Sequence, residues 1–161
     1  MPKLINKSEI IENTWQTLDK DFSGKLPDGS ILVPLNYLLE NPLILDSNPN
    51  IGIWLDSDQN SEALEPYLNK LSLIAINFPK FVDGRGYSYA RILRDRLDYQ
   101  GELRAIGDIL HDQLFYLKRC GFDSFAVRED KNIEVALQGL EDFSDSYQIA
   151  TDQPEPLFRR R

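Results

Sequence analysis

The chain has 161 residues, of which 42% are apolar and 11% aromatic, and it carries 18 Lys and Arg against 26 Asp and Glu. This length and composition predict one globular domain spanning residues 1–161 and exclude the disordered and fibrous classes. The net charge of −8 argues against nucleic-acid binding, the single Cys excludes a dithiol couple or a cysteine-rich metal cluster, and no apolar run is long enough for a membrane helix.

Residues 1–50 are expected to form a less regular N-terminal part. Residues 1–11 have no apolar core of a signal peptide, so the cytoplasm is the expected compartment. Residues 9–17 are compatible with a strand or a short helix. Residues 31–35 are compatible with an edge strand or the start of a helix, because Pro34 cannot donate a hydrogen bond to a sheet.

An α/β core is predicted over residues 51–142, where short apolar runs alternate with helical periodicity. Apolar runs bounded by turn residues predict strands at 51–55, 71–78, 102–107 and 124–128. The segments between and after them predict an irregular stretch at 62–69, limited by Pro66, and helices at 87–98, 108–120 and 133–140. Residues 143–161 lack periodicity and are expected to be an extended tail that ends in Arg159, Arg160 and Arg161.

Four residues in the predicted helices have expected local roles. Arg94 and Asp98 are four positions apart, which predicts an ion pair on the helix surface. Asp108 is the expected N-cap of the next helix, and Gly121 the glycine that ends it.

The alternation of strands and helices with short turns predicts a parallel sheet covered by helices. About four central strands in βαβαβαβ order are expected in residues 51–142. The pattern is compatible both with an open sheet and with part of a (β/α) barrel.

Several long segments of the chain resemble one bacterial family. They are FPKFVDGRGYSYAR at 78–91, GELRAIGD at 101–108, DQLFY at 112–116, RCGFD at 119–123 and the ending PLFRRR. Members of that family carry the label of an oxidoreductase involved in sulfite reduction, and their genes lie beside sulfite reductase genes. The resemblance spans nearly the whole chain and implies a part in assimilatory sulfate and sulfite reduction, with sulfite reductase as a partner.

The residues themselves do not indicate a redox centre. No G-x-G-x-x-G motif is present, because Gly84 and Gly86 are followed by Tyr-Ser-Tyr, and one Cys cannot hold an iron–sulfur cluster. No cofactor is therefore evident from the sequence, and redox chemistry would need a borrowed cofactor or a partner.

Charged residues follow each of the four predicted strands. In a parallel sheet the carboxyl ends of the strands meet at one edge, where ligands bind. We therefore expect this edge to gather Asp56 and Asp58, then Lys80, Asp83 and Arg85, then Asp108 and His111, and finally Arg128.

The loop between the second predicted strand and its helix is the candidate anion site. Its residues are Lys80, Asp83, Gly84, Arg85, Gly86 and Ser88, with Arg128 from a neighbouring strand end. The glycines allow a ligand close to the backbone, the helix start offers N–H groups, and Arg can bind a sulfate, phosphate or sulfite with two hydrogen bonds. Alternatively, Asp83 caps the helix and pairs with Arg85, and the glycines form only a turn.

Asp108 and His111 are three positions apart, so a carboxylate could orient an imidazole that acts as a general base. The alternative is a plain helix cap beside an exposed His. Asp112 and Gln113 could bind a ligand or face solvent. Cys120 lies at a helix C-terminus, where a thiolate is not stabilised, which favours a buried structural role.

These observations favour a non-catalytic accessory protein of sulfite reduction that binds an oxyanion or docks on sulfite reductase. One alternative is an enzyme of sulfur metabolism whose site contains Asp83, Arg85, Asp108 and His111. Another is a homodimeric structural or interaction protein, for which the tail and exposed aromatic residues are the basis. No metal site, nucleic-acid partner or membrane contact is expected.

Overall fold

The computed structural model describes residues 3–7, 9–79, 84–109, 111–127 and 132–144. Within these residues the fold is mixed α/β, with one eight-stranded sheet in the order β2-β1-β8-β7-β6-β5-β4-β3. The strands are β1 (Lys3–Asn6), β2 (Glu9–Glu12), β3 (Gln16–Thr17), β4 (Ile31–Pro34), β5 (Ile51–Leu55), β6 (Leu73–Phe78), β7 (Glu102–Gly107) and β8 (Ser124–Phe125).

The helices follow the strands in chain order. They are α1 (Leu35–Glu40), α2 (Ile44–Ser47), α3 (Arg85–Arg91), α4 (Leu114–Arg119) and α5 (Ile133–Ser144), with 3-10 segments at Ser61–Lys70 and His111–Gln113 and a π-helical turn at Ile92–Arg96. None of the helices in the described residues combines the length and apolar character that crossing a membrane requires.

The sheet is larger than the sequence predicts. The four expected central strands are β5 to β8, and they lie next to one another in parallel. However, β4 and β3 extend them in parallel on one side, whereas β1 and β2 form an antiparallel hairpin on the other. The prediction of about four parallel strands is therefore wrong in size and partly in direction, because the added strands have two to four residues each and show little periodicity.

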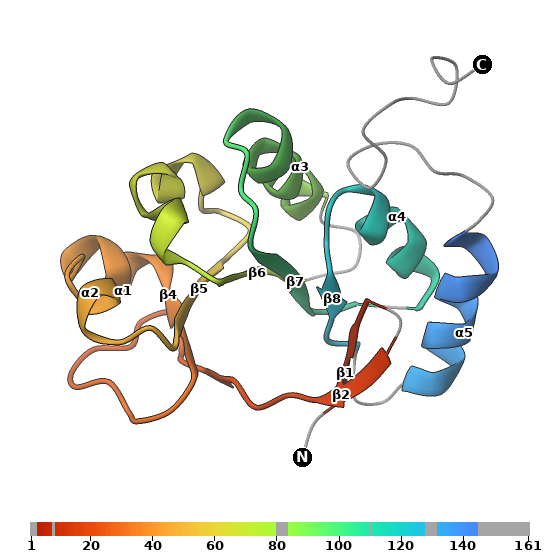
Figure 1. The fold of residues 1–161 in the computed structure, drawn as a ribbon, viewed down its shortest axis with the longest axis horizontal. Helices are drawn as coiled ribbons and strands as arrows, with labels where there is room; N and C mark the ends of the chain where they lie inside the picture. The colour runs from red at the N-terminus through yellow and green to blue at the C-terminus, as the bar shows by residue number, and fades with distance from the viewer. Residues whose placement is uncertain (1–2, 8, 80–83, 110, 128–131, 145–161) are drawn as a thin grey trace.

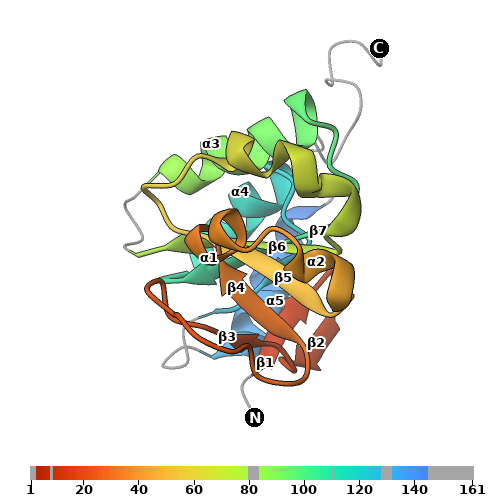
Figure 2. The ribbon, with the colours of Figure 1, turned by 90° about the vertical axis from the view of Figure 1, so that its left-hand side faces the viewer.

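The sheet is open, because its two end strands, β2 and β3, do not pair with each other. It is curled like half of a barrel. Right-handed connections between parallel neighbours place their helices on the same face. Figure 1 shows α3 and α4 above the sheet, α1 and α2 at its left end beside β4, and α5 at the right, beyond the β1–β2 hairpin. Figure 2 shows the β4 end of the sheet, with α1 and α2 in front and α3 above the strands.

The main core lies between this face and the helices. It contains fully buried residues from four of the parallel strands, among them Ile53, Ile76, Phe78, Ala105 and Phe125. Both faces of the central strands are covered, which explains why their sequences are apolar throughout.

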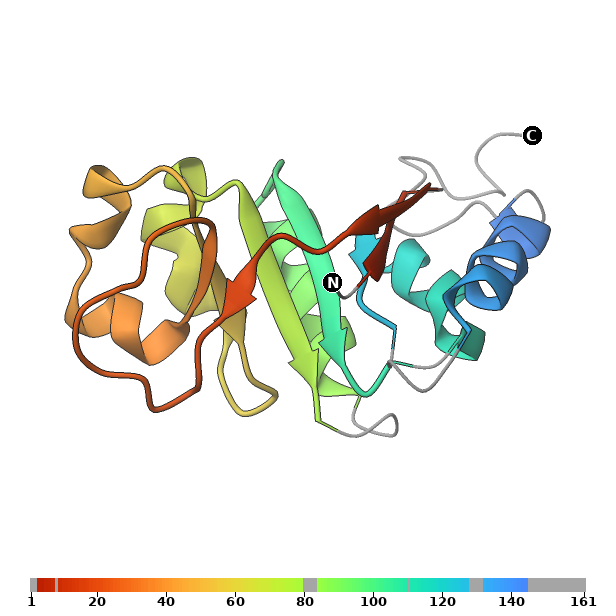
Figure 3. The ribbon, with the colours of Figure 1, turned by 90° about the horizontal axis from the view of Figure 1, so that it is seen from below.

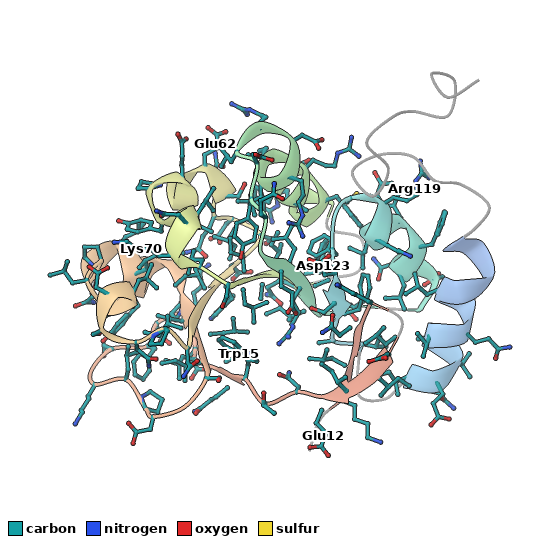
Figure 4. The ribbon with its side chains drawn as sticks, in the orientation of Figure 1. Glu12, Trp15, Glu62, Lys70, Arg119 and Asp123 are labelled. Atoms are coloured by element: carbon teal, nitrogen blue, oxygen red, sulfur yellow. The ribbon has the colours of Figure 1, made fainter. Side chains whose placement is uncertain are left out.

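The opposite face holds a smaller apolar cluster, Leu32, Trp54, Leu73 and Ala75. A segment that we call the N-terminal strap, residues 13–24, runs beneath this face, as Figures 1 and 3 show. Trp15, labelled in Figure 4, packs against the cluster from the strap. The strap therefore covers the side of the sheet that the helices leave uncovered.

Several N-terminal and loop boundaries differ from the sequence expectations. Residues 31–35 form both a strand and a helix start, and β4 is not an edge strand because β3 pairs with it. Pro34 is tolerated there because the β3 ladder reaches only Leu32. Residues 9–17 contain strands rather than a helix.

The helices also begin and end at other residues than expected. The helix predicted at 87–98 starts at Arg85 and ends with the π-helical turn at Arg96. The helix predicted at 108–120 begins with the 3-10 turn at His111–Gln113 and continues as α4. Residue 110, between Asp108 and this turn, lies outside the described residues, so the capping role of Asp108 stays a prediction. Gly121 follows the helix with φ 111°, as predicted. Strand β8 ends at Phe125, and α5 extends to Ser144, so the tail prediction is wrong for residues 143–144, whereas residues 145–161 lie outside the described residues.

Candidate functional site

The carboxyl ends of the central strands lie at one edge of the sheet. Leu55 at the end of β5 is in register with Ile76 of β6, and Phe78 at the end of β6 is in register with Gly107 at the end of β7. The residues that follow these strands therefore share this edge, which we call the carboxyl edge.

Asp56, the first residue after β5, is the centre of a polar cluster at the carboxyl edge. Its Oδ1 accepts hydrogen bonds from the Ser57 N–H at 2.8 Å and the Asn77 Nδ2 at 3.1 Å. Its Oδ2 lies 3.2 Å from the Nζ of Lys20 in the N-terminal strap. Lys20 Nζ also contacts both carboxylate oxygens of Asp58, at 2.8 and 3.0 Å. One lysine thus bridges two carboxylates.

The ionisation of this cluster follows from its contacts. Partial burial acts to raise the pKa of Asp56, but hydrogen bonds from Ser57 and Asn77 and the ion pair with Lys20 outweigh it, so the pKa lies below its ordinary value. The hydrogen bond to Asp58, followed by the contacts with Asp56, raises the pKa of Lys20 despite the opposing effect of burial. Asp56 and Lys20 are therefore both charged at neutral pH.

Ser57 connects this cluster to α3. Its hydroxyl accepts a hydrogen bond of 3.0 Å from Arg85 Nη2, and its carbonyl accepts one of 2.6 Å from the Tyr89 hydroxyl. Ser57 is buried, whereas Arg85 is exposed. The serine therefore holds the arginine in one direction at the surface of the carboxyl edge. The sequence analysis named Arg85 among the residues of this edge, but it did not single out Ser57.

The two glycines of the predicted anion loop differ in their surroundings. A Cβ on Gly86 would lie 2.6 Å from the ring of Phe78, so glycine is required for α3 to pack on β6. A Cβ on Gly84 would meet only Tyr87, at 4.0 Å. Ser88 is exposed, three positions after Arg85 and on the same side of the helix. Packing alone accounts for Gly86.

The end of β7 closes tightly against the end of β6. Gly107 has φ 95°, and a Cβ there would collide with the Oδ1 of Asn77 and lie 2.5 Å from the Phe78 carbonyl. The N–H of the next residue, Asp108, donates to the same carbonyl at 2.7 Å. Gly107 thus sets the position of half-buried Asp108 at the carboxyl edge.

Some predicted site residues are not described. Lys80, Asp83 and Arg128 lie outside the described residues, and so does the side chain of His111, whose backbone belongs to a 3-10 turn. The anion loop as a whole and the pairing of Asp108 with His111 therefore stay predictions. Among the described residues, no group of His, Cys, Asp and Glu side chains is placed to hold a metal ion.

Two neighbouring predictions concern Gln113 and Cys120. Gln113 is half-buried and donates a 3.1 Å hydrogen bond to the hydroxyl of Tyr87, so it does not simply face solvent. Its binding to a ligand stays a prediction. Cys120 is buried, and burial raises the pKa of its thiol, although the nearby Arg91 and Tyr116 act in the opposite direction. This supports a structural role for the cysteine.

Sequence reasoning missed Lys20 and Asn77. Asn77 has a detectable signal, because it is a polar residue near the carboxyl end of an otherwise apolar strand. Lys20 has none, since it lies in an irregular segment 36 positions before Asp56.

The fold and this edge define a mixed α/β protein with a charged cluster beyond its parallel strands. A family model described as a bacterial protein of unknown function (DUF934) matches residues 52–158. The match covers more than half of the chain, which therefore belongs to this bacterial family. It includes Asp56, Asn77 and Arg85 but not Lys20. No curated protein matches the chain.

Proposed function

We propose that the protein is an accessory protein of sulfate and sulfite reduction that binds a small oxyanion at the carboxyl edge, with Arg85 as the main ligand-binding residue. The observation that carries this proposal is the contact between Arg85 and Ser57. A buried hydroxyl holds an exposed guanidinium at the edge where ligands of parallel sheets bind.

The chemistry of this edge suits an oxyanion. A guanidinium stays protonated at every physiological pH, and its planar N–H groups match the oxygens of a sulfate or sulfite. The contact with Ser57 fixes the direction of Arg85 without adding an opposite charge, because a hydroxyl is neutral. Ser88, exposed on the same side of α3, adds a hydroxyl that can donate to the same ligand.

The sulfur part of the proposal rests on the resemblance of the long motifs between residues 78 and 123. An accessory role suits the sequence better than a reductase, since it has one Cys and no dinucleotide-binding motif. The proposed protein would deliver or sense an oxyanion beside a sulfite reductase that performs the redox chemistry.

Binding is tested by titrating the full chain with sulfate, sulfite and phosphate and following backbone amide signals by NMR. Arg85→Gln should weaken sulfate binding at least about tenfold, because a charged hydrogen-bond donor is lost. Arg91→Gln is the matched control: it removes the same charge from the same helix, where Arg91 pairs with Asp95 at 3.1 Å. Absence of binding to the native chain, or equal losses in the two variants, would contradict the proposal.

The cellular role is tested by deleting the gene and growing the strain on sulfate as sole sulfur source. We expect poor growth that the native gene restores and the Arg85→Gln gene does not. Growth equal to that of the parent strain would rule out a role in sulfate assimilation. Copurification with sulfite reductase would support docking as part of the accessory role.

A further inference from the structure

At the end of β5, the carboxyl edge combines an arginine that suits an anion with two carboxylates that oppose one, and Asp108 lies further along the same edge. Asp56 and Asp58 follow β5, and Asp56 is joined to Arg85 through one residue, Ser57. Unneutralised carboxylates so close to Arg85 would repel an arriving oxyanion and would also compete with it for the guanidinium.

Lys20 lies between these carboxylates. Its Nζ is 3.2 Å from Asp56 Oδ2 and 2.8 Å from Asp58 Oδ1. We propose that Lys20 is the specificity-determining residue of the carboxyl edge, because its charge makes an edge that ends in two carboxylates receptive to an anion. This inference rests on the proposed function, since it concerns the ligand of the same site.

The fold delivers Lys20 to this place through buried contacts of the strap. The Leu18 N–H donates to the Leu32 carbonyl at 3.0 Å, and the Leu18 carbonyl accepts a hydrogen bond of 2.8 Å from the Trp54 indole. Leu18 itself is buried. Lys20 follows two residues later, so its backbone is held at the end of β5 and its side chain has a short path to both carboxylates.

The range of electrostatic interactions supports an effect of Lys20 on a ligand at Arg85. Lys20, Asp56, Ser57 and Arg85 form a continuous series of contacts, each 3.2 Å or shorter. The Debye length at physiological ionic strength is about 8 Å, so each charge in this series acts on its direct neighbours with little screening by salt. The raised pKa of Lys20 and the lowered pKa of Asp56 agree with an ion pair that persists at neutral pH.

The chain offers a matched control. Lys70 pairs with Asp46 at 2.9 Å, and the two side chains are 45% and 52% exposed, against 39% and 60% for Lys20 and Asp58. Lys70→Met therefore removes an equally exposed ion pair from the end of the 3-10 segment Ser61–Lys70, a part of the chain that lies before β6 begins.

Sulfate titration of four proteins gives the first test. Lys20→Met should bind sulfate about fivefold more weakly than the native chain, and Lys70→Met should bind it equally well. Adding Asp56→Asn and Asp58→Asn to Lys20→Met should restore the affinity, because the repelling charges are gone. If the native chain binds sulfate and Lys20→Met binds it equally well, or if the triple variant stays as weak as Lys20→Met, the inference is wrong.

A second measurement needs no ligand and separates this inference from the proposed function. Anionic and cationic nitroxides enhance the relaxation of amide protons according to the local potential, which can be read at Arg85 and Ser88. Because Lys20→Met removes a positive charge, the cationic nitroxide should relax both amide protons more strongly, and the anionic nitroxide less strongly, than in the native chain. Lys70→Met should leave the relaxation of both amide protons unchanged. No change in Lys20→Met at either amide proton overturns the inference. If the relaxation changes in Lys20→Met but the native chain binds no sulfate, the effect of Lys20 on the local potential is established and only the proposed function is rejected. Unchanged thermal unfolding and amide dispersion confirm that each variant is folded.

Discussion

Two arginines at opposite edges of the sheet are held in different ways. At the amino ends of β7 and β8, Arg94 donates to the carbonyls of Tyr99, Gly101 and Gly121 at 2.8 to 3.0 Å and to Asp123 at 2.7 Å. Its side chain is only 15% exposed. These contacts connect the loop before β7 with the loop before β8, so Arg94 is a structural residue.

Arg85 at the carboxyl edge shows the contrast. It is exposed, and it donates a hydrogen bond of 3.0 Å to the hydroxyl of Ser57. The comparison teaches that the partners of an arginine indicate its role better than its charge does. Carbonyls of loops indicate a support for the fold, whereas a buried hydroxyl that directs an exposed guanidinium suits a ligand.

Breaking the structural side of this comparison should have the largest effect. Arg94→Ala removes a donor from three carbonyls and leaves the Asp123 carboxylate without its cation, although the Leu103 N–H still donates to it. We expect a loss of about 4 kcal/mol in the free energy of unfolding. Arg96→Ala, which removes an exposed pair with Glu62, should cost about 0.5 kcal/mol or less. Urea unfolding of both variants measures the difference. Similar small losses would show that Arg94 is not a support for the fold.

The backbone of the carboxyl edge is tested by Gly107→Ala. The left-handed φ of 95° and the collision with Asn77 and Phe78 should together cost about 3 kcal/mol. Gly29→Ala is the control, because Gly29 has φ 99° but nothing within 4 Å of its Cβ position. It should cost about 1 kcal/mol. Equal losses, measured by thermal unfolding, would mean that the close approach at Gly107 is unimportant.

The central strands could be predicted because their signals are local. Strands β5 and β7 have the predicted bounds, since each is a continuous apolar run between turn residues. For β2 the sequence left a strand and a short helix open, because a four-residue strand gains its stability from pairing with a partner that the sequence does not reveal.

Helix α3 and its π-helical turn show how a regular pattern fails. The spacing of Arg94 and Asp98 predicts an ion pair, but Asp98 has φ 55° and no longer belongs to the helix. Arg94 turns to Asp123, and Arg91 pairs with Asp95 instead, at 3.1 Å. The i,i+4 rule requires both residues to lie within the helix, and here the helix ends with the π-helical turn at Arg96, two residues before Asp98.

The candidate site also contains residues whose positions could be predicted from the sequence and residues whose positions could not. The position of Asp56 and Arg85 at one edge follows from the rule that parallel strands end together, which needs only the order of the elements. The lysine that neutralises Asp56 comes from the strap, and its approach depends on the tertiary contact between Leu18 and Trp54. Contacts of this kind join segments whose own sequences contain no common pattern.

The attachment of the strap gives a smaller expected effect. Trp54→Phe removes the hydrogen bond from the indole to the Leu18 carbonyl and part of the packed ring, which should cost about 1.5 kcal/mol. Hydrogen exchange of the Leu18 amide should become faster. Tyr37→Phe removes a hydrogen bond to Gly24 further along the strap and should leave the Leu18 amide unchanged. Unchanged exchange in Trp54→Phe would show that β3 alone holds the strap.

The smallest effect concerns the charge of Asp56 and its dependence on pH. Because the pKa of the folded carboxyl lies below the ordinary value of 3.8, its ionised form stabilises the native chain at higher pH, and this contribution is lost as the pH falls through the folded pKa. Asp56→Asn should therefore lower the free energy of unfolding by about 1 kcal/mol at pH 7. The difference between the native chain and the variant should shrink as the pH falls below the ordinary value. Asp46→Asn controls for the removal of a carboxylate from a Lys–Asp pair at pH 7 and should cost about 0.5 kcal/mol or less. If the difference in the free energy of unfolding between the native chain and Asp56→Asn stays constant down to acid pH, the destabilisation does not come from the lost charge. The ion pair with Lys20 would then not stabilise the carboxyl edge.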